Sequence, residues 1–141
     1  MNNAAISLLH EEAERIFYRR SFRKITGSVA ADILLQRMVS HFSNHNCTPF
    51  YKFQAPCAHP LYEQGASWDE ELGFSASEFD TALNQIGFRI AKPSNKPSST
   101  PITNGHLVTY WTDASLLTWY SVDMGLLVDR LEQHYAIANP A

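Results

Sequence analysis

Long apolar runs, cysteines and glycine-rich loops are scarce in this sequence, and each scarcity argues against a class of protein. No apolar run approaches the roughly 20 residues that a membrane-spanning helix needs. The N-terminus carries acids where a signal peptide would carry bases, so we expect a cytoplasmic protein that does not contact membranes. Two cysteines, Cys47 and Cys57, are too few for a disulfide framework, although a single bridge between them stays open. Without a glycine-rich phosphate loop or a Ser, His and Asp set, the chain is not expected to be an enzyme.

Basic residues are missing from the middle of the chain. Between Phe53 and Phe88 there is no Lys or Arg, and the same stretch holds six acids: Glu63, Asp69, Glu70, Glu71, Glu78 and Asp80. Bases cluster on either side of it, at Arg15, Arg19, Arg20, Arg23 and Lys24 before and at Arg89, Lys92 and Lys96 after. The net charge of −3 does not by itself indicate a nucleic-acid binder, because phosphate neutralisation needs clustered Lys and Arg. These basic residues either bind phosphates of a nucleic acid or only keep the protein surface solvated.

The length of 141 residues and the apolar content of 45% predict one domain with one core. We divide it into an N-terminal helix and basic arm (1–26), a core (27–122), and a C-terminal helix and tail (123–141). Apolar spacing predicts an amphipathic helix from Ala4 to about Arg15. The stretch 16–25 reads as a continuation of that helix or as an extended piece packing Phe17 and Phe22, and we favour the extended piece.

A long helix, a strand and a loop are expected between residues 28 and 66. Ser28 is expected to cap a long central helix whose buried residues are Val29, Ile33, Leu34, Met38 and Phe42. That helix should end at Asn44 to Asn46. An aromatic strand (48–53) and a loop containing two prolines and a glycine (54–66) are expected to follow.

The stretch Ser67 to Ile90 predicts two short helices, a tight turn and a strand. Ser67 with Glu70 and Ser75 with Glu78 both fit the S-x-x-E capping box, and Gly73 between them suits the left-handed end of a helix. The spacing is that of a helix-turn-helix. Apolar residues form one stripe on each helix: Trp68 and Leu72 on the first, and Ala76, Phe79, Ala82, Leu83 and Ile86 on the second. Gly87 should end the second helix, and Phe88, Arg89 and Ile90 should form a strand.

The C-terminal third predicts a projecting loop, a hairpin and a helix. Pro93, Pro97 and Pro101 argue against a strand after Ile90. Two runs of β-formers (107–112 and 116–122) flank a turn at 113–115 and predict a hairpin. Asp123 should cap a last helix that carries Met124, Leu127, Leu131 and Tyr135 on one face.

The order of these elements resembles the winged-helix fold. The segments ITGSVAADILLQRMV, PFYKF, SWDEELGFSASEFDTALNQIGF and LLTWYSVD are similar to winged-helix proteins of phages, plasmids and replication-initiation modules. The resemblance covers about Ile16 to Tyr135. It implies an α+β winged helix-turn-helix with a small antiparallel β wing, flanked by N- and C-terminal helices. It also implies a non-enzymatic regulator or replication-associated protein of a mobile element that binds duplex DNA, forms a homodimer through its terminal helices and needs no cofactor.

In such proteins the helix matching Ser75 to Ile86 enters the major groove, and the loop after Ile90 contacts the backbone or the minor groove. A helical projection places Ser77, Thr81 and Asn84 opposite the core, with Glu78, Asp80 and Gln85 on the flanks. The candidate DNA-binding residues are therefore Ser75, Ser77, Glu78, Thr81, Asn84, Gln85, Arg89, Lys92 and Lys96. Because the acids of this helix repel phosphate, a solvated face, or a protein-interaction or assembly module with a basic partner, is the alternative.

Two further groups of residues have a functional and a structural reading. His41, His45, Cys47, Cys57 and His59 could supply zinc ligands, but they include no C-x-x-C pair, and we expect no metal site. Trp68, Tyr110, Trp111, Trp119 and Tyr120 could stack on bases, but their spacing favours packing in the core or at a dimer interface.

Overall fold

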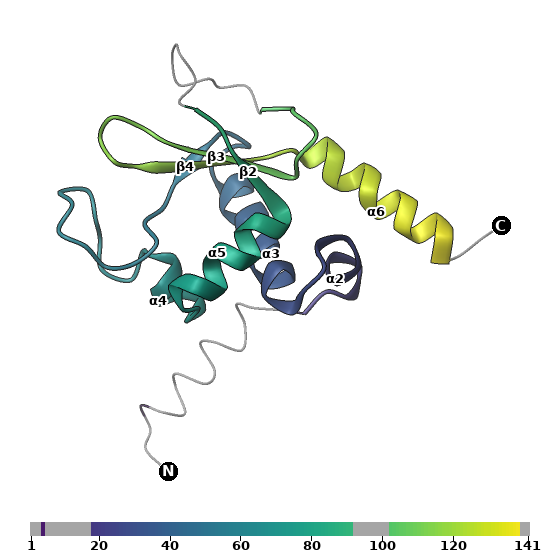
Figure 1. The fold of residues 1–141 in the computed structure, drawn as a ribbon, viewed down its shortest axis with the longest axis horizontal. Coiled ribbons are helices and arrows are strands. Elements are labelled where there is room, and N and C mark those ends of the chain that lie inside the picture. Colours follow the sequence, from purple (N-terminus) through teal and green to yellow (C-terminus); the bar gives the residue numbers. More distant parts are fainter. Residues whose placement is uncertain (1–3, 5–17, 92–101, 139–141) are drawn as a thin grey trace.

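The computed structural model describes Ala4 and residues 18–91 and 102–138 (Figure 1). In these residues the chain forms five helices and one four-stranded sheet, so the fold is a mixed α+β arrangement. The amphipathic helix expected from Ala4 to Arg15 lies outside the described residues except for Ala4 itself. The prolines of the expected projection, with Lys92 and Lys96, also lie outside them.

The sheet has the strand order β1-β4-β3-β2. Its strands are β1 (Phe50–Tyr51), β2 (Gly87–Arg89), β3 (Val108–Thr112) and β4 (Thr118–Val122). The predicted hairpin is confirmed, because β3 and β4 pair antiparallel from Val108 with Val122 to Thr112 with Thr118. β1 pairs antiparallel with β4, and β2 pairs parallel with β3. The strand expected at 48–53 is shorter than predicted, since Pro49 cannot donate a ladder hydrogen bond.

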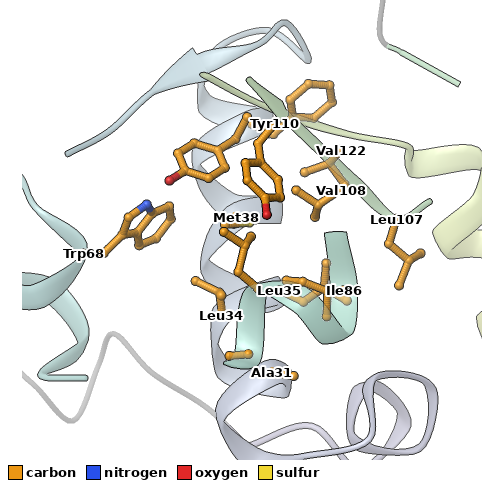
Figure 2. Close-up of a cluster of buried hydrophobic side chains, with 14 of the residues drawn as sticks. Ala31, Leu34, Leu35, Met38, Trp68, Ile86, Leu107, Val108, Tyr110 and Val122 are labelled. Atoms are coloured by element: carbon orange, nitrogen blue, oxygen red, sulfur yellow. The ribbon is translucent and has the colours of Figure 1, made fainter. Parts of the chain in front are cut away.

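The central helix α3 (Val29–Asn44) packs against β4 and α5. Ser28 caps it as predicted, with its Oγ accepting from the amide of Ala31 at 3.1 Å. Its buried apolar side chains are Ala31, Leu34, Leu35, Met38 and Phe42, and Figure 2 shows Leu35 and Met38 in one cluster with Ile86 of α5 and Tyr110 of the sheet. The prediction that Val29 is buried is wrong, since its side chain is 51% exposed. At 3.6 residues per turn Val29 lies about 140° around the helix from Leu34, outside this stripe.

The stretch preceding α3 is helical, and the preferred extended reading is therefore wrong there. α2 (Arg20–Thr26) contacts α3 and α6, and it buries Phe22 in the core. A helix satisfies the backbone of this segment while placing Phe22 and Ile25 on one side. It ends at Gly27, whose φ of 97° is in the left-handed region. Phe17, the other expected anchor, lies outside the described residues.

The two short helices are α4 (Trp68–Leu72) and α5 (Ala76–Ile86), and both predicted capping boxes are present. Gly73 ends α4 with a φ of 70°, as predicted. The apolar stripe of α5 is buried as expected except at Ala76, which is exposed because the first turn of α5 lies at the rim of the core. Gly87 ends α5 in an extended conformation and begins β2. A Cβ on it would lie 3.2 Å from the carbonyl oxygens of Leu83 and Val108, so only glycine fits without displacement.

The last helix, α6 (Met124–Ala138), begins as predicted, with Asp123 Oδ1 accepting from the amide of Leu126 at 2.9 Å. Figure 1 shows α6 extending away from the sheet, and its main contact is with α2. Leu127 is buried, but Tyr135 is 68% exposed, because it lies beyond the part of the helix that reaches the core. None of the helices within 18–91 and 102–138 has both the length and the apolarity that a bilayer crossing requires.

The aromatic residues considered as stacking platforms contribute to packing. Trp68 is 1% exposed and lies among Phe50, Phe79 and Tyr120, with ring centroids 5.8–6.4 Å apart. Tyr110 and Tyr120 are also buried and stack on each other across β3 and β4. Trp111 is largely buried and Trp119 is partly exposed, on the other face of the sheet.

Candidate nucleic-acid interface

The exposed side of α5 carries three small polar residues. Ser77, Thr81 and Asn84 lie opposite the buried stripe of Phe79, Leu83 and Ile86. Their side chains combine hydroxyl groups and an amide, which can both donate and accept hydrogen bonds. This is the arrangement that the helical projection predicted, and it leaves the polar groups of this face accessible to a ligand.

Ser75 and Glu78, also predicted to contact DNA, are engaged in capping. Ser75 Oγ accepts from the amide of Glu78 at 3.1 Å, and Glu78 Oε1 accepts from the amide of Ser75 at 3.0 Å. The hydrogen bond from the Ser75 backbone, followed by that from its side chain, lowers the pKa of Glu78. These two residues therefore fix the start of α5 and keep a negative charge there.

Gln85 is similarly committed to the fold. Ser28 Oγ donates to Gln85 Oε1 at 2.5 Å, which joins the end of α5 to the N-cap of α3. The amide group of Gln85 also lies over Gly27, with its Nε2 atom 3.5 Å from where a Cβ would stand. No local pattern indicates this bond, because the two residues are 57 positions apart.

Arg89 follows α5 on β2 and is held in a fixed direction. Its Nη1 donates to Thr112 Oγ1 at 3.0 Å, and its guanidinium carbon lies 4.9 Å from the centre of the Tyr110 ring. A cation stacked on an aromatic face and hydrogen bonded at one nitrogen keeps further donors for an anionic ligand. Lys92 and Lys96, predicted to act beside it, lie outside the described residues.

A cleft of about 450 Å³ brings part of the predicted surface together. One wall comes from α5 and β2, with Asp80, Asn84 and Arg89. The segment after β1 and the hairpin also line the cleft, with Lys52, Thr118 and Leu116. Asn84 and Arg89 therefore face one space, whereas Ser75 and Glu78 lie at the far end of α5.

Comparison with known protein families, curated proteins and solved structures finds no match to this chain.

An ion cluster that the sequence analysis missed positions α4. The carboxylate of Glu71 pairs with three side chains: Arg37 Nε at 2.7 Å, His41 Nε2 at 2.9 Å and Lys52 Nζ at 3.1 Å. Burial opposes ionisation of this carboxyl, but the hydrogen bond and charge of His41, with Arg37 and Lys52, lower the pKa of Glu71 to about 2. The cluster ties α4 to α3 and to the residue after β1, and its members are too far apart in sequence for a local pattern to indicate it.

The histidines and cysteines considered as zinc ligands are dispersed. His41 bonds Glu71, and His59 Nε2 lies 2.7 Å from the carbonyl oxygen of Ser115. Cys47 and Cys57 are both free and exposed. Over the described ranges, no three His, Cys, Asp or Glu side chains are grouped so that they could hold a metal ion.

The hairpin turn contains a feature that the sequence analysis did not anticipate. Leu116 has a φ of 65° and a side chain that is 74% exposed, and it is one of the residues that line the cleft. Glycine and asparagine are the residues that usually adopt this conformation. The residue pattern predicts only a turn between two strands here, and a leucine beside that turn does not indicate a positive φ.

Proposed function

We propose that this chain is a non-enzymatic winged-helix protein that binds duplex DNA through α5, as a regulator or replication-associated protein of a mobile element. The order α3, β1, α4, α5 and then the β3–β4 hairpin supports this proposal, as does the placement of β1 beside β4. In this arrangement α4 and α5 form the helix-turn-helix, and the hairpin is the wing.

The observation that carries the proposal is the exposed polar face of a firmly positioned helix. Both ends of α5 are fixed, by the Ser75 capping box at its start and by Gln85 and Ser28 near its end. A helix in the major groove reads bases through polar side chains held in a fixed register, and Asn, Ser and Thr are among the residues that make such contacts. Ser77, Thr81 and Asn84 are the residues of this kind on α5.

Attraction to phosphate must come from outside α5, which carries Glu78 and Asp80 and no Lys or Arg. Arg89 borders the same cleft as Asn84. Arg19, Arg20 and Lys24 are exposed at α2, which packs against α3. Contacts to phosphate position a protein and contacts to bases specify the sequence, so the two tasks can be carried by different segments.

A salt titration tests the proposal. Affinity of the full chain for a pool of random duplex DNA should fall steeply as salt rises, because each neutralised phosphate releases counterions. Absence of binding even at low salt would refute the proposal.

A pair of matched double variants then tests the role of α5. Thr81→Ala with Asn84→Ala should reduce discrimination between a selected binding sequence and random DNA while leaving the salt dependence unchanged. Ser43→Ala with Asn44→Ala removes similar polar groups from the exposed end of α3 and should change neither quantity.

A homodimer is part of this proposal. α6 exposes the apolar side chain of Val128, which is 47% exposed, on a helix whose main contact is with α2, and we infer that this side of α6 meets a second copy. Light scattering should give twice the mass of one chain, and Val128→Glu should give a monomer.

The acids of α5 favour one second candidate, a protein-interaction module with a basic partner. Glu78 and Asp80 are both exposed on the helix. Asp80→Asn separates the two functions: it should strengthen binding to DNA by removing a repulsive charge, and it should weaken binding to a basic protein surface.

A further inference from the structure

The turn of the β3–β4 hairpin holds Leu116 with a positive φ and an exposed side chain, and leucine favours neither. Leu116 adopts the left-handed backbone region, where a Cβ meets steric resistance. Its side chain is largely in water, so burial does not compensate for this conformation. Residues held in sparsely populated backbone regions cluster at functional sites, so this leucine is a candidate for a function.

The turn beneath Leu116 is fixed by several hydrogen bonds. Asp113 Oδ1 accepts from the amides of Ser115 at 2.8 Å and Leu117 at 3.0 Å, and Asp113 Oδ2 accepts from Trp119 Nε1 at 2.9 Å. The amide of Leu116 itself donates to the carbonyl oxygen of Asp113 at 3.1 Å. The leucine therefore projects from a rigid support.

Leu116 also lies on the side of the molecule that we propose to face DNA. It borders the same cleft as Asp80 and Asn84 of α5 and Arg89 of β2. A duplex that contacts the polar face of α5 would meet the hairpin tip across this cleft. The apolar tip is thus continuous with the proposed DNA surface.

We propose that Leu116 is a wedge that enters between two neighbouring base pairs of the duplex held by α5. This inference rests on the proposed DNA binding. Leucine is among the apolar side chains that proteins insert at base steps, where they unstack the bases and kink the duplex. Because unstacking is easiest at TA and CA/TG steps and at mismatches, the preferred ligand is a duplex with such a weak point where the hairpin meets it.

The experiment compares two short fluorescent duplexes that differ only by one central mismatch. The full chain should bind the mismatched duplex on the order of tenfold more tightly, because the mismatch removes part of the unstacking cost. Leu116→Ala and Leu116→Gly should bind the matched duplex nearly as well as the unaltered chain and should lose the preference, whereas Leu116→Phe should retain it. Leu61→Ala, which truncates another exposed leucine, is the matched control and should leave the preference unchanged.

The outcomes separate the wedge from DNA binding itself. Salt-dependent binding without a mismatch preference would overturn the wedge and leave the proposed function standing. The wedge would also be overturned, with the proposed function left standing, if Leu116→Ala keeps the full mismatch preference or weakens binding to both duplexes equally. Failure of every variant and of the unaltered chain to bind either duplex at low salt would overturn the proposed function, and the wedge with it.

Discussion

Ser28 at the start of α3 and Gln85 near the end of α5 are joined by a hydrogen bond of 2.5 Å between Ser28 Oγ and Gln85 Oε1. Ser28 Oγ also accepts from the amide of Ala31, so one hydroxyl caps α3 and anchors α5. The orientation of the proposed reading helix is therefore linked to the start of the central helix.

This bond predicts a measurable coupling between the two residues. In a double-mutant cycle of Ser28→Ala and Gln85→Ala, urea unfolding should give a coupling free energy of about 1 kcal/mol, the usual net contribution of one hydrogen bond. Gln64→Ala, in the loop before α4, should show no coupling to Ser28→Ala. A coupling near zero for Gln85 would show that the bond does not hold α5.

Two serines at the start of α5, the N-cap Ser75 and Ser77 in the first turn, should respond differently to the same substitution. Ser75→Ala should lower the free energy of unfolding by about 1 kcal/mol, because the amide of Glu78 loses its acceptor. Ser77→Ala should change it by less than about 0.5 kcal/mol, since Ser77 is an exposed surface residue. Thermal unfolding of both variants checks this difference, and equal losses would contradict the capping role of Ser75.

The Glu71 cluster should make the free energy of unfolding depend on pH in the acid range. The folded-state pKa of Glu71 is about 2, below its ordinary value of 4.5, so its ionisation stabilises the fold. This stabilisation is fully present above pH 4.5 and is lost as the pH falls toward 2. Glu71→Gln should lower the free energy of unfolding by about 2 kcal/mol near neutral pH, because Arg37 and Lys52 lose their charged acceptor.

The difference between the unaltered chain and Glu71→Gln should therefore shrink as the pH is lowered through this range. Glu63→Gln, at an exposed position in the loop, serves as the control and should change stability little at any pH. A difference that stays constant from pH 5 to the acid limit would show that ionisation of Glu71 is not what the cluster uses.

Removing the leucine at the hairpin tip should stabilise the protein. Leu116→Gly relieves a left-handed conformation that opposes a Cβ by about 1–2 kcal/mol, partly offset by the greater freedom of glycine in the unfolded chain. We expect the melting temperature to rise, with a net gain of about 0.5–1 kcal/mol. Leu61→Gly, at an exposed leucine without a positive φ, should instead lower it.

The parts of the fold that the sequence predicted correctly depend on neighbouring residues. Each capping box, Gly73 and the hairpin are determined within a few positions, and local hydrogen bonds decide them. The apolar stripe of α5 is likewise a matter of helical spacing. These features place Ser77, Thr81 and Asn84 on the exposed side without knowledge of the tertiary structure.

The features that the sequence analysis missed depend on residues far apart in the chain. Gln85 bonds to Ser28, 57 positions away in the sequence. Glu71 bonds to His41 and Arg37, which are 30 and 34 positions away. Nothing in the composition near Gln85 distinguishes an anchor from a base reader. Leu116 was missed for a different reason, because a strained backbone angle leaves no mark in the residue pattern.

The strand order also has a consequence for how the protein is made. β1 ends at Tyr51, but its partner β4 runs from Thr118 to Val122. During synthesis from the N-terminus, the sheet cannot be completed until Val122 has left the ribosome. Pairings between such distant segments close large loops and slow folding. A nascent chain stalled before Thr118 would therefore carry the residues of α4 and α5 without the complete sheet.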